Sequence, residues 1–348
     1  MDRFEIKLNE INEILSKNQL GLIYDFINDR DNGLVLPFFS KYMDSVQKLD
    51  LDFCITTNSH FQCGIIYDEK LIFMSYGTFD RLCKLSDLIF RSGMITGKST
   101  NLNFYDLHLV TNPFVGFNNE IREESESESH LFMFILDCLM LFIVSHEVGH
   151  FINKHGDRAK KQSIDTIFDD VLGHKKINSA ELISSHAREL VADGFALNIV
   201  KKHVQSAFDQ KVSYLDNLLD FYSSKEGGIA FSLLLILCYF KLSDGLSPHE
   251  HFQSTHPSTA ARVRFILSCH IESLVNEDEE KTFGFYYGLI ITQLKSIFAS
   301  MGDDFELTWI KDTNSPEMTE WFNDVYKEHP KWLGKVRISR SFLPKLTR

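Results

Sequence analysis

The sequence predicts a mostly helical α+β protein, and three observations lead to that prediction. Apolar residues recur at helical spacing over most of the chain, whereas the alternation typical of strands is confined to residues 52–76. Two strongly apolar runs, residues 131–144 and 229–240, have the length of buried helices. Both runs are shorter than the ~20 residues that a membrane-spanning helix needs, so we expect core helices and no membrane span.

The elements follow from the pattern along the chain. Ile6, Ile11 and their neighbours recur at helical spacing, which predicts an N-terminal helical region. Residues 52–76 combine alternation with β-branched and aromatic residues around Asp68-Glu69, which predicts a hairpin. Helical periodicity returns at residues 79–90, and the chain ends in a further helical region with a basic tail. We therefore expect three parts: residues 1–50, residues 51–275 and residues 276–348.

Composition narrows the class of protein. Hydrophobic residues make up 44% and charged residues 24% of the chain, as in soluble globular proteins. The net charge of −12 provides no broad basic field, so nucleic acid is not expected as the main partner. The basic tail, residues 327–348, is interpreted as a solvated face. Six scattered cysteines without C-x-x-C pairs, and a start without an apolar leader segment, predict a cytoplasmic protein.

The most specific signal is the pentapeptide His146-Glu147-Val148-Gly149-His150, which ends the first apolar run. Residues four apart share one face of a helix, so both imidazoles can reach one Zn²⁺. Glu147 lies one residue round the helix, in a position to act as general base toward water. An ordinary helix whose two histidines only satisfy hydrogen bonds stays open as an alternative at this point.

A site with two histidines needs at least one more protein ligand. Metzincin proteases are excluded, because Asn153 and Gly156 stand where that class requires glycine and a third histidine. We interpret His155, one residue away from the required place, as a solvated histidine near the helix end. A later apolar segment carries Glu189 and Asp193 four residues apart, and buried carboxylates need a partner or a metal. The simplest assignment makes Glu189 the third ligand and Asp193 the acceptor that orients a ligand imidazole.

A third segment follows at residues 255–266. There, His256-Pro257 opens a predicted helix, and Arg262 projects from that helix more than one turn later. The chain thus carries, in order, H-E-x-x-H, E-x-x-A-D and H-P followed by an arginine. These three motifs resemble those of the gluzincin zinc metallopeptidases of the HtpX and CAAX-prenyl-endopeptidase type.

The resemblance implies a zincin-like metallopeptidase domain with one bound Zn²⁺ and a protein or peptide substrate. It implies that His256 and Arg262 bind substrate or polarise its carbonyl group. Residues 62–77 look like the strand pair of that family, in which one edge strand receives the peptide. The expected site consists of the zinc ligands His146, His150 and Glu189, the general base Glu147, the orienting carboxylate Asp193, and the substrate-side residues His256 and Arg262.

Among soluble relatives, the layout looks most like the Lit-type phage-exclusion peptidases. The shared elements are H-E-x-x-H, R-E-x-x-A-D at residues 188–193, a Gly-led apolar helix at residues 228–239, and T-H-P at residues 255–257. This similarity implies a bacterial or prophage endopeptidase that cuts a host protein in phage defence. The chain departs from the wider family, whose members usually carry membrane spans or a signal peptide and have a shorter connection before the metal helix.

Two other functions stay open from the sequence. The chain can be a zinc-binding sensor or regulatory protein that keeps the site without turnover, or a helical protein whose histidines are structural. Glu147 argues against the sensor, because a protein without turnover has no need of a general base. The zinc content of the purified protein would separate the structural alternative from the other two.

Overall fold

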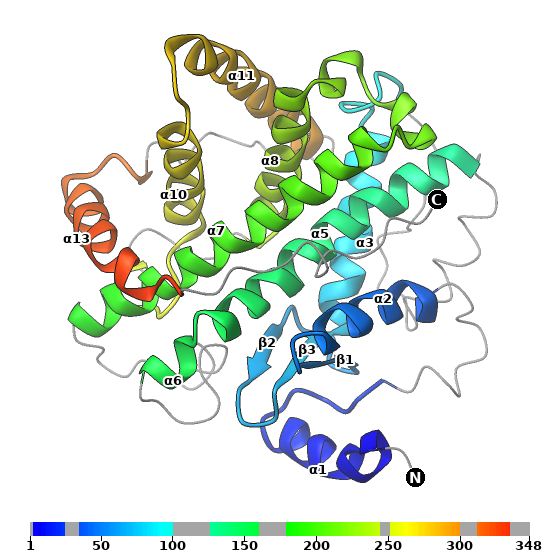
Figure 1. Cartoon of the computed structure of the whole chain (residues 1–348), viewed down its shortest axis with the longest axis vertical. Coiled ribbons are helices and arrows are strands. Elements are labelled where there is room, and N and C mark those ends of the chain that lie inside the picture. Colours follow the sequence, from blue (N-terminus) through cyan, green and yellow to red (C-terminus); the bar gives the residue numbers. More distant parts are fainter. Residues whose placement is uncertain are drawn as a thin grey trace.

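The computed structural model describes residues 3–24, 35–99, 126–159, 179–243, 251–299 and 312–334. Helices dominate these residues, and a small sheet lies at one end of them (Figure 1). The predicted fold class, a mostly helical α+β domain with a small edge sheet, is confirmed. The helices are α1 (Arg3–Lys17), α2 (Val35–Gln47), α3 (Tyr76–Arg91), α5 (Glu126–Ile152), α6 (His155–Ala159), α7 (Ser179–Asp209), α8 (Lys225–Leu242), α10 (Thr259–Glu272), α11 (Glu277–Ala299) and α13 (Pro316–Trp332), with 3-10 turns η2 (Ser213–Asn217) and η3 (Asp220–Ser223).

Helices α5 and α7 lie side by side through the centre of the molecule (Figure 1). α5 is apolar on nearly every side because α3, α7, α8 and the sheet all pack against it. Its segment His130–Ile152 is long and apolar enough to cross a bilayer, but 94% of the apolar window is buried inside the protein. The expected core helix is therefore present, and it carries the H-E-x-x-H motif at its C-terminal end.

The sheet has three strands, β1 (Asp52–Thr56), β2 (Cys63–Ile66) and β3 (Leu71–Ser75), in the order β1-β3-β2. The predicted hairpin is β2–β3, which pair antiparallel. β1 lies parallel to β3, a third strand that the hairpin prediction did not include. The outer side of β1 pairs with residues 22–24 of the chain, so within the described residues β2 is the open edge.

The junction between β3 and α3 is tight, and it fixes residues beside β2. Ser75 ends β3 and caps α3, because its Oγ accepts from the backbone N–H of Thr78 at 3.0 Å. The Thr78 hydroxyl in turn accepts from the N–H of Gln62 at 2.8 Å. A Cβ at Gly77 would meet the carbonyl oxygen of Ser59 at 2.0 Å, so only glycine fits there. This corner therefore holds the chain that enters β2 at the start of α3.

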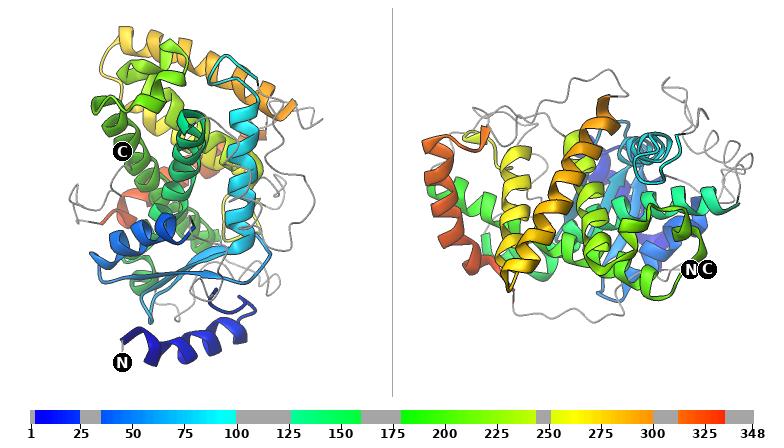
Figure 2. Two further views of the ribbon diagram at one scale, coloured as in Figure 1. Left: turned by 90° about the vertical axis from the view of Figure 1, so that its right-hand side faces the viewer. Right: turned by 90° about the horizontal axis from the view of Figure 1, so that it is seen from above.

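The C-terminal region is helical, as predicted, and consists of α11 and α13 in the described residues. In the right-hand view of Figure 2, α13 lies at the left edge of the molecule, and α10 and then α11 lie next to it. α13 packs on α7 and α10 through an apolar face that includes Met318, Trp321, Phe322, Val325 and Trp332. Residues 335–348 of the basic tail lie outside the described residues. The division at residues 50 and 275 stays a prediction.

Candidate metal centre and active-site cavity

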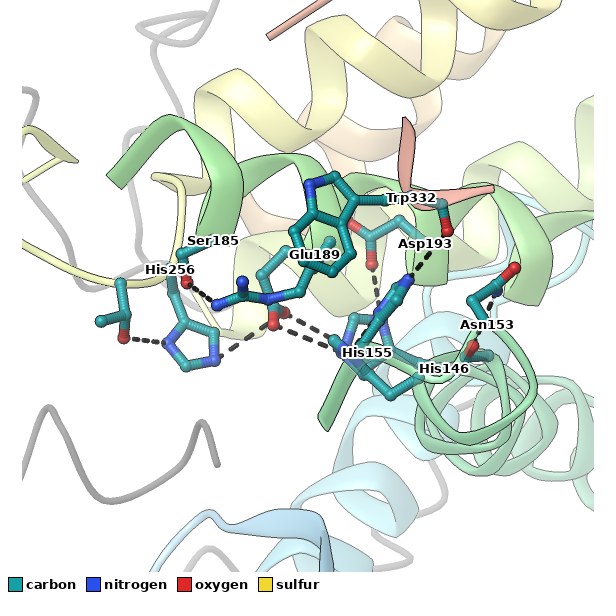
Figure 3. A network of polar contacts seen from close by, with 12 residues as sticks. His146, Asn153, His155, Ser185, Glu189, Asp193, His256 and Trp332 are labelled. Carbon is teal, nitrogen blue, oxygen red and sulfur yellow. Dashed lines mark hydrogen bonds and ion pairs between the residues drawn. The ribbon is translucent and has the colours of Figure 1, made fainter. Parts of the chain in front are cut away.

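Three side chains with metal-binding atoms converge between α5 and α7. His146 and His150 stand one turn apart on α5. Glu189 comes from α7 and faces His146 (Figure 3). The two Nε2 atoms are 3.1 Å apart. Nε2 of His146 lies 3.2 Å from Oε2 of Glu189, and Nε2 of His150 lies 3.3 Å from Oε1 of the same carboxylate. All three residues are buried, and one ligand atom of each lies within 4.8 Å of the other two. We call these three residues the metal triangle.

This triangle has the dimensions of a metal site. A tetrahedral ion with bonds of ~2.0–2.1 Å to nitrogen or oxygen keeps its ligand atoms about 3.3 Å apart, close to the separation of the two Nε2 atoms and to the distance from each Nε2 to the Glu189 oxygen that it contacts. Among the described residues, Glu189 pairs only with histidines and with no lysine or arginine. Although its burial acts in the opposite direction, His256, His150 and His146 hold the pKa of Glu189 well below its usual range. The buried His146, His150 and Glu189 can thus hold a metal ion, and their donor set fits one.

Glu147 lies beside the triangle and lines the same cavity. The residue is 6% exposed. Burial raises the pKa of its carboxyl group, while the nearby imidazoles of His146 and His150 act in the opposite direction. Glu147 therefore stands next to the convergent donor atoms with a carboxyl group more basic than usual.

Asp193 supports His146 from one turn further along α7. Its Oδ1 lies 2.9 Å from Nδ1 of His146, the nitrogen that points away from the triangle. Burial disfavours a charge on His146, but hydrogen bonds with Asp193 and Glu189 outweigh it and raise its pKa to about 10. Arg262 donates to both oxygens of Asp193, from Nε at 2.8 Å and from Nη2 at 2.6 Å. The structure thus joins Arg262, Asp193 and His146 in one chain of contacts.

His155 supports the other histidine, contrary to the prediction that it is solvated. It is 1% exposed, and its Nδ1 lies 2.9 Å from Nδ1 of His150. Its Nε2 lies 3.3 Å from the carbonyl oxygen of Trp332, at the end of α13. Burial, together with the neighbouring His150, lowers the pKa of His155 to about 2, so the imidazole is neutral. The prediction was wrong because the chain turns at Lys154, where φ is 56°, and directs the next residue back under α5.

His256 lies on the opposite side of Glu189 from His146 (Figure 3). Its Nε2 is 3.7 Å from Oε2 of Glu189, and its side chain is 23% exposed. The backbone N–H of His256 donates to Oγ of Ser254 at 3.0 Å, and the carbonyl of Ser254 faces Nε2 of His186 on α7 at 2.9 Å. The loop before α10 thus holds His256 at the rim of the metal triangle.

A cavity of about 340 Å³ opens beside these residues. The structure brings His146, Glu147, His150, Glu189, His256 and Arg262 to its wall, whereas Asp193 lies behind it. Its remaining walls include Phe61, Cys63, Phe142, Ile143 and Tyr239. The wall also includes the polar residues Gln62, Thr78, Ser243 and Thr259, so the cavity combines the convergent donors with both apolar and polar surface.

The comparison with known proteins gives the family. A family model for peptidase U49 matches residues 110–284, which is half of the 348-residue chain. The chain belongs to the peptidase U49 family. Membership supports a protease, that is, a hydrolase whose substrate is a protein. No curated protein and no solved structure matches the chain.

The matched part of this U49 peptidase contains the complete metal triangle and the cavity residue His256. It spans α5, α7, α8 and α10. The three strands and α13 lie outside it, although β2 contributes Cys63 to the cavity and α13 contributes a carbonyl oxygen to His155. The site of this U49 peptidase therefore includes residues that lie outside the part of the chain matched by the family model.

Sequence reasoning missed Tyr239, because it stands in an apolar run typical of a core helix. Its ring lies 5.4 Å from the ring of Phe142, and the residue lines the cavity. Burial raises the pKa of its hydroxyl, which therefore stays protonated and able to donate. Within the described residues, this hydroxyl makes no hydrogen bond. Cys63 was missed for a similar reason: burial, together with Glu147, raises the pKa of its thiol, which remains neutral in the cavity.

Proposed function

We propose that this U49 peptidase is a zinc-dependent endopeptidase that hydrolyses peptide bonds within a protein substrate. The observation that carries the proposal is the triangle of His146, His150 and Glu189 next to Glu147, in one cavity of a chain from a peptidase family. The resemblance of its three motifs to those of gluzincin metallopeptidases, and to the Lit-type layout in particular, supports the same function.

Zn²⁺ is the metal we propose, because two imidazole nitrogens and one carboxylate oxygen are a ligand set typical of catalytic zinc. Such a set leaves a fourth position, and the triangle borders the cavity from which substrate would arrive. When bound, Zn²⁺ supplies Lewis-acid chemistry, which polarises the scissile carbonyl and makes water more acidic.

Glu147 is the proposed general base. It would take a proton from the attacking water and pass it to the nitrogen of the leaving amine. The upward shift of its pKa suits this task, because a carboxylate with a higher pKa is a stronger base. Glutamine at this position would keep the shape of the side chain but would have no lone pair basic enough to accept the proton.

Three donors at the cavity wall are proposed to stabilise the negative oxygen of the tetrahedral intermediate. His256 and Arg262 are the donors that the motif resemblance implies, and Tyr239 is added because it lines the cavity and its hydroxyl makes no hydrogen bond within the described residues. Arg262 already directs Nε and Nη2 to Asp193, so part of its role is to hold that carboxylate behind His146.

The peptide substrate is proposed to add to the open edge of the sheet at β2. Because the N–H of Ser75 donates to the carbonyl of Gln62, these two residues form a hydrogen-bonded pair. Pairs alternate along an antiparallel ladder, so Cys63 and Ile65 turn their N–H and C=O groups toward the free edge. This edge leads to the cavity, where Cys63 lies beside Glu147. Backbone pairing along β2 would thus carry a substrate strand to the catalytic groups.

The cellular role is proposed on the Lit-type resemblance. We infer a cytoplasmic enzyme, in agreement with an apolar helix that is buried in the protein and with six free cysteines. A host protein cut during phage infection is the proposed substrate, and nucleic acid is not expected as the main partner because the net charge is −12.

The proposal is tested by measuring zinc and proteolysis together. We expect about one Zn²⁺ per purified chain, and new protein fragments in cells that express the wild type. Cells that express Glu147→Gln should lack those fragments while the variant keeps its zinc. Glu280→Gln, which removes an exposed carboxylate on α11, is the matched control and should behave like the wild type. Identical fragments with Glu147→Gln would contradict the mechanism, and zinc without fragments in any strain would favour the sensor.

A further inference from the structure

Each ligand histidine has one ring nitrogen in the metal triangle and one outside it. For His150, Nε2 faces His146 and Glu189, whereas Nδ1 lies 2.9 Å from Nδ1 of His155. Two ring nitrogens at this distance share one hydrogen, which one donates to the lone pair of the other. A metal at the triangle requires the lone pair of His150 at Nε2. The hydrogen of His150 must therefore be at Nδ1, and His155 must accept it.

The same logic fixes the second nitrogen of His155. Since its Nδ1 accepts, its hydrogen is on Nε2, and that atom faces the carbonyl oxygen of Trp332 at 3.3 Å. A carbonyl oxygen can only accept, so both hydrogen bonds run in the same direction, from His150 to His155 and from His155 to the carbonyl of Trp332. Nη1 of Arg158 donates to the same oxygen at 3.2 Å, which fixes the position of this carbonyl from a second side.

We propose that His155 is a positioning residue for the metal ligand His150, and that the C-terminal end of α13 holds His155 in that role. The inference rests on the proposed metal function, and it adds a part of the chain outside residues 110–284 to the metal site. A hydrogen-bond acceptor behind a ligand imidazole fixes its tautomer and its orientation. Here that acceptor is a neutral imidazole, whereas His146 has the carboxylate of Asp193.

Contacts beyond Trp332 attach this end of α13 firmly to the end of α5. The backbone N–H of Gly334 donates to Oδ1 of Asn153 at 2.5 Å, and Nδ2 of Asn153 donates to the carbonyl of Gly149 at 2.7 Å. A Cβ at Gly334 would lie 2.7 Å from that same Oδ1, so a side chain at this position would have to displace the Asn153 side chain. Residues 332–334 are thus bonded to the helix turn that carries His150.

The N-terminal half of α13 contacts His186 on α7, which in turn contacts the loop that carries His256. Trp321 precedes Trp332 by eleven residues, which is close to three helical turns, so both lie on one face of α13. Nε1 of Trp321 donates to Nδ1 of His186 at 2.9 Å, and His186 contacts the carbonyl of Ser254 in the loop that carries His256. One helix therefore supports both the ligand on α5 and the loop at the cavity rim.

The first measurement reads the tautomers directly in the wild-type protein loaded with zinc. Nitrogen NMR of the imidazole rings should show His150 protonated at Nδ1, and His155 protonated at Nε2 only. A hydrogen on Nδ1 of His155, or a His155 ring that exchanges freely with solvent, would overturn the proposal. This measurement needs no substitution, so it holds whether or not a variant folds.

The second measurement is the Kd for Zn²⁺, determined by competition with a chelator of known affinity. His155→Phe keeps a ring but loses both nitrogens, and should weaken zinc binding about 10- to 100-fold. His155→Asn keeps an acceptor where Nδ1 was and should recover part of the affinity. Gly334→Val, far from the ligands in sequence, should weaken binding in the same direction as His155→Phe.

The outcomes separate this proposal from the proposed function. A wild type that binds no zinc would defeat the zinc enzyme itself. A wild type that binds zinc, with His155→Phe folded and its Kd unchanged, would overturn only the positioning role. Lower thermal stability of the metal-free His155→Phe protein together with an unchanged Kd would likewise show a purely structural histidine and overturn it.

Discussion

Two buried polar clusters lie between the antiparallel helices α5 and α7, and they differ in whether a lysine or arginine balances their buried carboxylate. In the metal triangle, one ligand atom each of His146, His150 and Glu189 lies within 4.8 Å of the other two. In the second cluster, named here the Asp137 cluster, the carboxylate of Asp137 on α5 meets His203 on α7 at 3.0 Å. Its other partners are Lys41 and Tyr42, both from α2.

The difference teaches how to distinguish a structural cluster from a functional one. Lys41 and His203 keep the pKa of Asp137 low despite its burial, and the hydroxyl of Tyr42 donates to the same carboxylate. The Asp137 cluster is thus neutralised by its own side chains. In the triangle, Glu189 has only histidines as partners in the described residues, and the cavity leads to it. A buried group of metal-binding side chains that includes no lysine or arginine and lies next to a cavity indicates a ligand site.

Removal of one triangle residue should give the largest effect. We expect His150→Ala to lose stoichiometric zinc and, with it, the stabilisation by zinc, which is about 4 kcal/mol when free zinc is a thousandfold above Kd. The metal-free variant should unfold like the metal-free wild type. Zinc content and thermal unfolding with and without chelator check this, with His130→Ala on the exposed side of the same helix as control. Wild-type melting that chelator leaves unchanged would contradict the ligand role.

The Asp137 cluster should respond in stability alone. Asp137→Asn leaves Lys41 without its buried partner and should cost about 3 kcal/mol, the low end for such pairs, because the Lys41 side chain is 18% exposed. Zinc affinity should not change. Denaturant unfolding and zinc titration check both statements, and the exposed Asp324→Asn on α13 is the matched control.

The ion pair between Asp137 and Lys41 also predicts how the stability of the protein depends on pH. The pKa of Asp137 is lowered in the folded protein, so its contribution is complete above the unfolded value of about 3.9 and is lost as pH falls through the folded pKa. The stability difference between wild type and Asp137→Asn should therefore shrink in acid below pH ~4. If the stability difference between wild type and Asp137→Asn grew on acidification, the ionised carboxylate of Asp137 would not be the source of the stabilisation.

A tyrosine lies in the Asp137 cluster, and another lines the cavity beside the metal triangle; their removal should have opposite effects. Tyr239→Phe should keep zinc and stability but slow hydrolysis about 100-fold, as the loss of one oxyanion donor does, and His256→Ala should resemble it. Tyr42→Phe should lower stability and leave the rate unchanged, because its hydroxyl donates to Asp137. Single-turnover rates on the protein substrate found by the fragment comparison check this. Equal rates for Tyr239→Phe and wild type would remove Tyr239 from the mechanism.

The carboxylate behind His146 should give a smaller effect than the triangle residue Glu189. Asp193→Asn should keep zinc but bind it about 10- to 100-fold more weakly, whereas Glu189→Ala should fail to retain it. Arg262→Ala should lower stability as well, because it leaves the buried Asp193 without its counter-charge. Zinc competition titrations on the three variants give the order. If Asp193→Asn lost zinc and Glu189→Ala kept it, the two carboxylates would have to exchange roles.

The candidate ligands were predictable from sequence because their spacing is local. His146 and His150 are one helical turn apart, and Glu189 and Asp193 are one turn apart on another helix. Helical geometry alone brings each pair to one face, whatever the rest of the chain does. The long apolar run of α5 and the hairpin β2–β3 were predictable for the same reason, since each depends on periodicity within a short segment.

Contacts between segments that are distant in the sequence were decided only by the tertiary structure. His155 meets the carbonyl of Trp332, 177 positions away in the chain, and Arg262 meets Asp193, 69 positions away. Tyr239 belongs to an apolar run and faces the cavity only because α8 packs beside α5 and α7. The sequence by itself determined which residues share a helix face. Packing of those helices decided which faces meet, because burial is favoured by the total apolar area and not by any one local pattern.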